Sequence, residues 1–215
     1  MRKYINRKSL VVLFFATIVF IYMSNNYDSL FMRSIDNNIL MWLHEYTQFF
    51  MVYFFEFVTL MGGWQMVILI SIILLIIERD KIQVLLIPSI TVMSVIINET
   101  IKNVIMRPRP NVMALSHASG YSMPSGHSLT AVVFYGLIII FLVAKIKDKK
   151  YRKLINVLLT VLITLIGFSR VYLRVHYFSD VVAGLALGLM IVTVVYNIKV
   201  GVFDNITTYL EEENE

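Results

Sequence analysis

The sequence predicts an all-α integral membrane protein in which six transmembrane helices form one bundle, with a further interfacial helix on the outer side. Three observations predict this fold class. The 215 residues are 58% hydrophobic and only 15% charged, the mean hydropathy is +0.75, and six apolar runs approach the length that a helix needs to cross a bilayer. A soluble globular domain does not have this composition. The absence of cysteine excludes a disulfide scaffold, thiolate catalysis and thiolate metal ligation.

The six apolar runs carry no charge over most of their length. They are 9–23, 57–77, 82–98, 128–144, 154–169 and 181–198. Some are shorter than about 20 residues, and polar flanking side chains complete the reach to the membrane surfaces. The first run resembles a signal peptide because basic residues precede it. No small-x-small cleavage site follows, so we interpret it as an uncleaved anchor.

Basic residues at the ends of the runs predict the orientation. The N-terminus is basic, and the connection 145–153 is rich in lysine and arginine, which favours the cytoplasmic side for both. Both chain ends are then cytoplasmic, with 199–215 as a solvated tail. The outward-facing segments are 24–56, 99–127 and 170–180. Nucleic-acid binding is not expected despite the net charge of +5, because the basic residues flank apolar runs.

The first outer segment, 24–56, contains an amphipathic stretch. Its apolar residues fall on one helical stripe: Ile35, Ile39, Trp42, Leu43, Tyr46 and Phe50. Such a helix either lies in the membrane interface, where it could guide a lipid, or packs on the bundle. The sequence leaves both interpretations open.

The two later outer segments concentrate positive charge where outer loops normally avoid it. They hold Lys102, Arg107, Arg109, Arg170 and Arg174. Charges near membrane depth are usually functional, and interface snorkelling is the structural alternative. Pro108 and Pro110 end the preceding helix and stiffen its exit. The cations are thereby held near the surface, where a guanidinium fits phosphate bidentately.

Two further patterns on this side contain histidines. The first, Pro124-Ser125-Gly126-His127, opens the fourth run, where a helix N-terminus presents unpaired N–H groups to an anion. Ser125 could instead be only an N-cap.

The second pattern begins with Ser169-Arg170 and continues to His176 and Asp180. These last two residues are four apart and share a face if they are helical. An aspartate in this position fixes the tautomer of the imidazole, or it caps the sixth run.

In order, these residues resemble the three-part signature of the phosphatidic acid phosphatase type 2 superfamily. The matching spacing is Lys102-x6-Arg109-Pro110, then Pro124-Ser125-Gly126-His127, then Ser169-Arg170-x5-His176-x3-Asp180. Three motifs in order have a far lower false-positive rate than one. The resemblance covers 57–198, which becomes the catalytic core of a single membrane domain spanning 1–215. Arg107 and Arg174 have no assigned role, and either could pair with lipid head groups.

The resemblance implies a metal-free, two-step phosphoryl transfer that needs no cofactor. By position, His176 is the nucleophile that forms a phosphohistidine, Asp180 orients it, and His127 protonates the leaving oxygen. The phosphoryl oxygens are bound by Lys102, Arg109, Ser125, Gly126 and Arg170. In the motif regions on this side the only carboxylates are Glu99 and Asp180, too few for a two-metal site.

The leading interpretation is therefore a lipid phosphatase of the outer leaflet. The resemblance suggests phosphatidylglycerophosphate, phosphatidate or undecaprenyl diphosphate as its substrate. The sequence does not distinguish among these three lipids, and it does not indicate an oligomeric state. A second interpretation is a non-catalytic lipid-binding or transport protein, and a third is a vanadate-dependent haloperoxidase, whose relatives are soluble. Gly184 and Gly188 indicate close helix packing within the bundle or a dimer contact.

Overall fold

The computed structural model describes residues 7–111 and 113–203, and these ranges contain eight α-helices and no strand. In chain order the helices are α1 (Arg7–Asn26), α2 (Leu30–Glu45), α3 (Phe49–Leu60), α4 (Trp64–Ile77), α5 (Lys81–Ile105), α6 (Gly126–Phe141), α7 (Lys149–Tyr172) and α8 (Phe178–Ile198). A 3₁₀ turn (Val143–Lys145) follows α6, and a π-helical turn (Lys199–Phe203) follows α8. The all-α class is confirmed. The predicted tail, 199–215, lies outside the described residues from 204 onward.

Five helices are long and apolar enough to cross a membrane alone, namely α1, α5, α6 with its 3₁₀ turn, α7 and α8. The pair α3 and α4 passes the same test only together and is bent by 52°. The described residues thus provide up to six spans, as expected of a multi-pass membrane protein. The second predicted run, 57–77, is not one straight helix, because it breaks at Gly62 and Gly63. Glycine has a low propensity for the interior of a helix.

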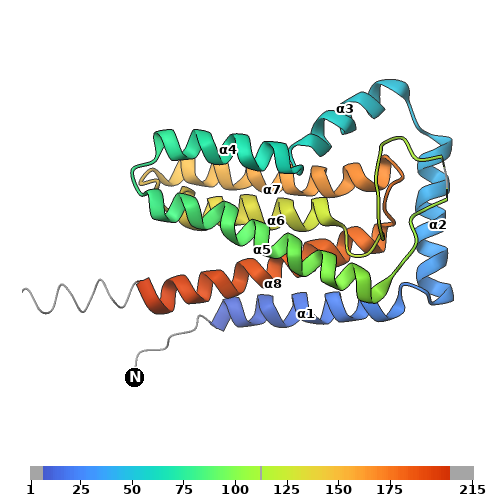
Figure 1. Cartoon of the computed structure of the whole chain (residues 1–215), viewed down its shortest axis with the longest axis horizontal. Helices are drawn as coiled ribbons and strands as arrows, with labels where there is room; N and C mark the ends of the chain where they lie inside the picture. The colour runs from blue at the N-terminus through green and yellow to red at the C-terminus, as the bar shows by residue number, and fades with distance from the viewer. Residues whose placement is uncertain (1–6, 112, 204–215) are drawn as a thin grey trace, which may run out of the picture.

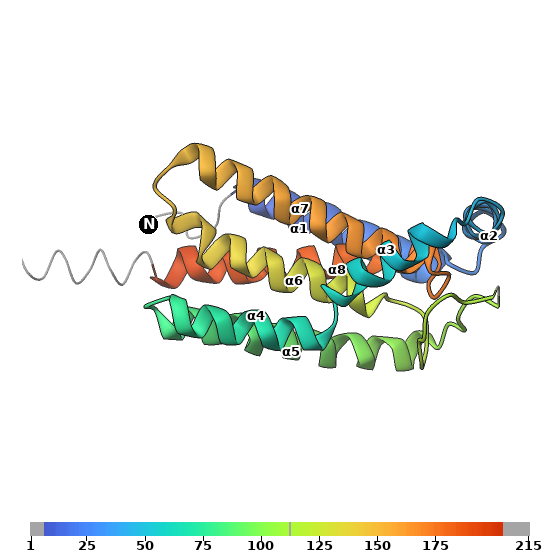
Figure 2. The same ribbon diagram turned by 90° about the horizontal axis from the view of Figure 1, so that it is seen from above.

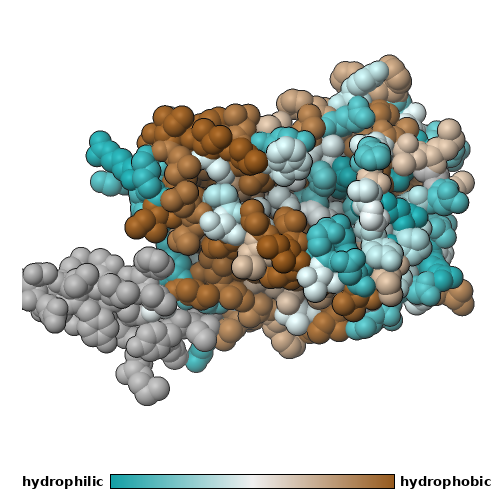
Figure 3. All heavy atoms as spheres, in the orientation of Figure 1, coloured by the Kyte–Doolittle hydropathy of each residue, from teal (hydrophilic) through white to brown (hydrophobic). Residues whose placement is uncertain are grey.

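The spans lie side by side, and α2 crosses one end of the bundle almost at right angles (Figures 1 and 2). At this end, called the site end below, α5 and α7 finish and α6 and α8 begin. Apolar side chains gather over the flank of the bundle, and polar ones gather at the site end (Figure 3). This division is the one that a bilayer around the flank requires.

Helix α2 packs on the bundle with a face that overlaps the predicted stripe at Ile39 and Leu43 but not along its whole length. Its buried residues are Met32, Asp36, Leu40 and Leu43. Trp42 and Tyr46 of the stripe are exposed instead. The buried face also contains a carboxylate, Asp36. The helix therefore lies across the end of the bundle, and a charged contact fixes its rotation.

Close packing of α8 on α6 explains the two glycines of the sixth run. A Cβ atom on Gly184 would lie 2.5 Å from the carbonyl oxygen of Ser125, and one on Gly188 would lie 2.7 Å from Cβ of Val132. Both glycines are buried against α6. Their small size thus serves helix packing within one chain.

We expect Gly188→Ala to lower the free energy of unfolding by about 1–3 kcal/mol, because the added methyl group overpacks the α6–α8 contact. Thermal unfolding of the detergent-solubilised protein measures this effect. The matched control is Gly136→Ala, whose new Cβ would meet the side chain of Val192 at 3.1 Å and requires a smaller shift. Equal unfolding temperatures for both variants would contradict the expectation.

Candidate functional site

A cavity of about 740 Å³, with several charged residues in its lining, lies at the site end. Six of the predicted site residues line it: Lys102, Arg109, Gly126, His127, Arg170 and His176. The other two, Ser125 and Asp180, are fully buried behind this lining. The fold therefore brings all three sequence patterns together around one cavity, although they are far apart in the chain.

The imidazole of His176 lies in the turn between α7 and α8 and is only 2% exposed. Its Nε2 atom is 3.1 Å from Nη1 of Arg109. A guanidinium has no accepting lone pair, so Arg109 donates and Nε2 accepts. Nδ1 then carries the proton and points to Oδ2 of Asp180 at 3.4 Å. This tautomer directs the lone pair of Nε2 towards the arginine that lines the cavity.

The carboxylate of Asp180 serves the helix and the histidine at once. Oδ2 accepts the backbone N–H of Tyr177 at 2.8 Å, which completes a capping box at the start of α8. The hydroxyl of Ser122 also donates to Oδ2. Oδ1 is taken by Arg107, whose Nη1 lies 2.6 Å away. The sequence left open whether Asp180 caps the helix or orients His176, and in the structure this one side chain does both.

The N-terminus of α6 faces the cavity without a side-chain cap from Ser125. The hydroxyl of Ser125 instead accepts a hydrogen bond from the hydroxyl of Ser128 at 2.9 Å. The backbone N–H of Ser125 donates to the backbone carbonyl of Asp180 at 3.0 Å. The next residue, Gly126, is close to Lys102, since a Cβ on the glycine would lie 3.8 Å from Nζ. A positive helix end and an ammonium thus converge on the same wall.

Three cations dominate the electrostatics of the cavity. Lys102 pairs with Glu99 at 2.8 Å, and Arg170 donates from Nη1 to the hydroxyl of Thr59 at 2.7 Å. Nε of Arg170 is buried and has no partner among the described residues. Arg109 is held by backbone carbonyls rather than by a carboxylate. This excess of positive charge suits a multiply charged anion such as phosphate.

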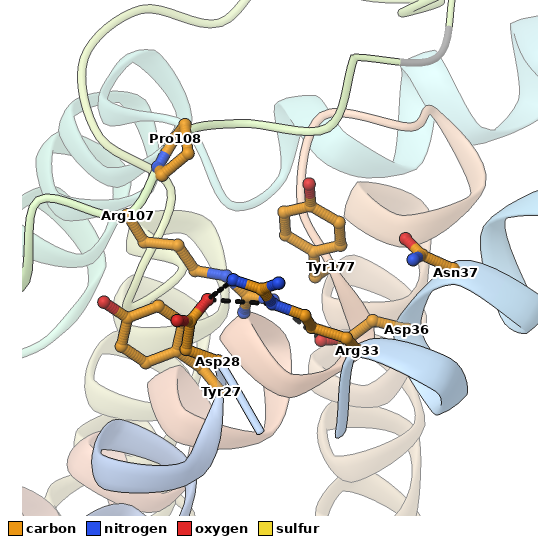
Figure 4. Close-up of a pocket in the computed structure, with 8 residues that line it drawn as sticks. All are labelled: Tyr27, Asp28, Arg33, Asp36, Asn37, Arg107, Pro108 and Tyr177. Atoms are coloured by element: carbon orange, nitrogen blue, oxygen red, sulfur yellow. Dashed lines mark hydrogen bonds and ion pairs between the residues drawn. The ribbon is translucent and has the colours of Figure 1, made fainter. Parts of the chain in front are cut away.

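Arg107 and Arg174 are both buried, which differs from the expectation that they could pair with lipid head groups. The guanidinium of Arg107 forks between Asp36 of α2 and Asp180 of α8. Figure 4 shows it beside the ring of Tyr177, whose centroid lies 4.0 Å from Cζ. Arg174 contacts Nδ1 of a second α2 residue, His44. Both arginines thus bind the protein itself.

Sequence reasoning missed several polar residues of the site. Asn98 lines the cavity, and neither atom of its buried amide has a partner among the described residues. Its position four residues before Lys102 places it on the same face of α5 and was a usable signal. Asp36 was signalled by a charge within an amphipathic stretch. Nothing in the sequence points to Ser122 or Thr59.

No group of three or more His, Cys, Asp or Glu side chains that could hold a metal ion occurs within residues 7–111 and 113–203. The positive charge in the lining is supplied by lysine and arginine.

Comparisons with known proteins find a matching protein family and relatives that are named as phosphatases. The PAP2 superfamily model matches residues 83–203. Phosphatidylglycerophosphatase B of Bacillus subtilis is 40% identical over 97 residues, which is 45% of this chain and 48% of that protein. Lipid A 1-phosphatase of Helicobacter pylori is 26% identical over 128 residues, 58% of this chain and 63% of that protein. Each alignment spans less than two thirds of the relative.

Two solved structures share the fold. The transmembrane PAP2 type phosphatidylglycerolphosphate phosphatase from Bacillus subtilis matches with a TM-score of 0.78 and 26% identity, covering 90% of this chain and 96% of that one. LpxE of Aquifex aeolicus matches with a TM-score of 0.60 and 19% identity, covering 75% of this chain and 93% of that one. The second shows a likeness of fold alone.

We expect His176 to titrate well below an ordinary histidine. Burial lowers the pKa of its imidazole from 6.5 to about 4, while Asp180 opposes this shift and Arg109 adds to it. The lone pair of Nε2 therefore stays free of a proton at every pH above about 4. Imidazole ¹⁵N shifts of the histidine-labelled protein, followed as a function of pH, measure this. A midpoint near 6.5 for His176 would contradict the geometry.

Proposed function

This chain belongs to the PAP2 superfamily, and from that premise we propose that it is a phosphoric ester hydrolase acting on lipid phosphates. One observation carries the proposal: the unprotonated Nε2 of a buried histidine, His176, meets a guanidinium at a cavity lined by cations. The named relatives support it, since both curated proteins reported above are phosphatases of lipids. The activity, substrate and mechanism are proposals for this chain.

In the first step, Arg109 gives up its hydrogen bond to Nε2 of His176 and donates to a phosphoryl oxygen instead. The freed Nε2 lone pair attacks phosphorus, and the bond from phosphorus to the leaving oxygen breaks. His127 gives its proton to that oxygen, so a neutral alcohol departs from a monoester. Asp180 holds the Nδ1 proton and stabilises the positive charge that develops on the ring. The product is a phosphohistidine and a lipid without its phosphate.

In the second step, water attacks the phosphohistidine. His127, now neutral, takes a proton from the water as the new phosphorus–oxygen bond forms. The phosphorus–nitrogen bond breaks, inorganic phosphate leaves, and Nε2 of His176 regains its lone pair. The protons and charges balance over the two steps without a co-reactant other than water.

Fixed positive groups supply the electrostatic part of catalysis. Lys102, Arg109 and Arg170 approach the cavity from different elements, and the α6 N-terminus adds backbone N–H groups at Gly126. Because these groups are already in place, no reorganisation is needed as charge spreads over the phosphoryl oxygens.

A lipid substrate is supported by the place of the cavity at the end of an apolar bundle. The α3–α4 break forms part of its wall through Gly62 and Gly63, and the neighbouring Trp64 is exposed on the flank. A lipid can therefore present its phosphate from the side while its tail stays in the membrane. We place the site on the extracytoplasmic face and both chain ends in the cytoplasm, since the basic connection 145–153 lies at the opposite end of the bundle.

Phosphate release from a panel of lipid monophosphates and diphosphates tests the function. We expect purified wild-type protein to release phosphate, and His176→Ala to lose at least about 10³-fold in rate because the nucleophile is gone. We expect activity to persist in EDTA. Loss in EDTA that Mg²⁺ restores would contradict the metal-free mechanism, and a phosphoenzyme surviving in His176→Ala would remove this residue from its role. Lipid binding without phosphate release would favour a non-catalytic lipid-binding protein.

The leaving group gives a second test. A diphosphate expels a phosphate, which needs less help from an acid than an alkoxide does. We therefore expect His127→Ala to slow monoester hydrolysis by about 10²–10³-fold and diphosphate hydrolysis by clearly less. Each substrate is the control for the other in the same preparation. Equal losses on both substrates would refute the role of His127 as a leaving-group acid.

A further inference from the structure

Helix α2 reaches the candidate site through a buried chain of ion pairs. Asp36 is fully buried, and its Oδ2 accepts from Nη2 of Arg107 at 2.8 Å. The other fork of Arg107, Nη1, lies 2.6 Å from Oδ1 of Asp180. In Figure 4 the guanidinium of Arg107 lies among the side chains of α2 and Tyr177. Arg107 thus bridges Asp36 of α2 and Asp180, the carboxylate that contacts His176.

We propose that Asp36 and Arg107 are positioning residues, which hold Asp180 and through it the imidazole of His176. This inference rests on the proposed function. Neither residue is among the positions of the three-part signature described in the sequence. Neither contacts the ring of His176, so they act through Asp180.

The division of the two carboxylate oxygens supports this role. Arg107 occupies Oδ1 of Asp180, while Oδ2 receives Ser122, the N–H of Tyr177 and Nδ1 of His176. Rotation of the carboxylate would break bonds at both oxygens. Arg107 therefore fixes the plane in which Oδ2 meets the imidazole.

Asp36 also holds the first turn of α8, on which Asp180 stands. Its Oδ1 accepts the backbone N–H of Ser179 at 2.9 Å, and its Oδ2 accepts the hydroxyl of the same residue. Nη1 of Arg107 donates to that hydroxyl at 2.7 Å. A carboxylate from another helix thus satisfies an N–H that α8 cannot pair internally.

The charge balance makes the arginine fork necessary. Two carboxylates, Asp36 and Asp180, are buried on either side of one guanidinium, which also lies over the ring of Tyr177. A lysine at 107 would keep the charge, but a single ammonium cannot reproduce the planar fork. Removing either partner leaves a buried charge unpaired, which strongly disfavours the observed arrangement.

Kinetics of Asp36→Asn test the proposal, with Asp28→Asn as the matched control. Asp28 precedes α2 and lines the same pocket as Asp36, but it pairs with Arg33 and is exposed. We expect Asp36→Asn and Arg107→Lys to reduce kcat by about 10–100-fold, in the range of other outer-shell partners of a site histidine. Because neither residue touches the substrate, KM and inhibition by inorganic phosphate should change by less than about twofold. Asp28→Asn should keep the kcat of the wild type.

Several outcomes would overturn the inference. An unchanged kcat in Asp36→Asn or in Arg107→Lys would overturn it. A rise in KM without a fall in kcat would overturn it as well. If Asp36→Asn does not accumulate as folded protein, Ser179→Ala decides, because it weakens the same contacts without leaving a charge unpaired. A several-fold loss of kcat at constant KM supports the inference, and an unchanged kcat overturns it. If the wild type releases no phosphate from any lipid, the proposed function fails separately.

Discussion

The carboxylate of Asp180 is the contact on which the candidate site depends. It closes the capping box of α8, receives the Nδ1 proton of His176, accepts the hydroxyl of Ser122 and pairs with Arg107. These contacts come from separate parts of the chain, and each needs the carboxylate to remain in one orientation. Local helix capping, tertiary packing and the tautomer of the imidazole are therefore consequences of the same buried group.

The second constraint is the cost of burying charge at the end of an apolar bundle. Some arginines at this end pair with protein carboxylates, and others do not. Arg107 lies between two buried carboxylates, whereas Arg109 and Arg170 meet carbonyl and hydroxyl oxygens. The first kind stabilises the fold, and the second leaves positive potential for an incoming anion. Arginine thus serves two purposes at the same end of the bundle.

The sequence predicted the spans because apolar runs of fixed length leave a direct mark in it. It proposed the site residues from motifs of fixed spacing, and the fold brings these motifs to one cavity. It did not predict the break within 57–77, because both halves are equally apolar and the kink depends on how Gly62 packs. A Cβ there would lie 2.6 Å from Cγ2 of Ile166 and 3.4 Å from the carbonyl of His127. The spacing of the signature separated Arg109 from Arg107, but it gave Arg107 no role, because only the fold shows that Arg107 meets two buried carboxylates.

The double use of Asp180 has a consequence for how such a protein can diverge. A substitution there would unwind the first turn of α8 as well as release the imidazole, so selection for a new substrate has little freedom at this position. Trp64 and Gln65, which follow the α3–α4 break, are less constrained, because they line the cavity and are exposed. Under the proposed function, substitutions at these two positions can change which lipid binds without disturbing the histidine.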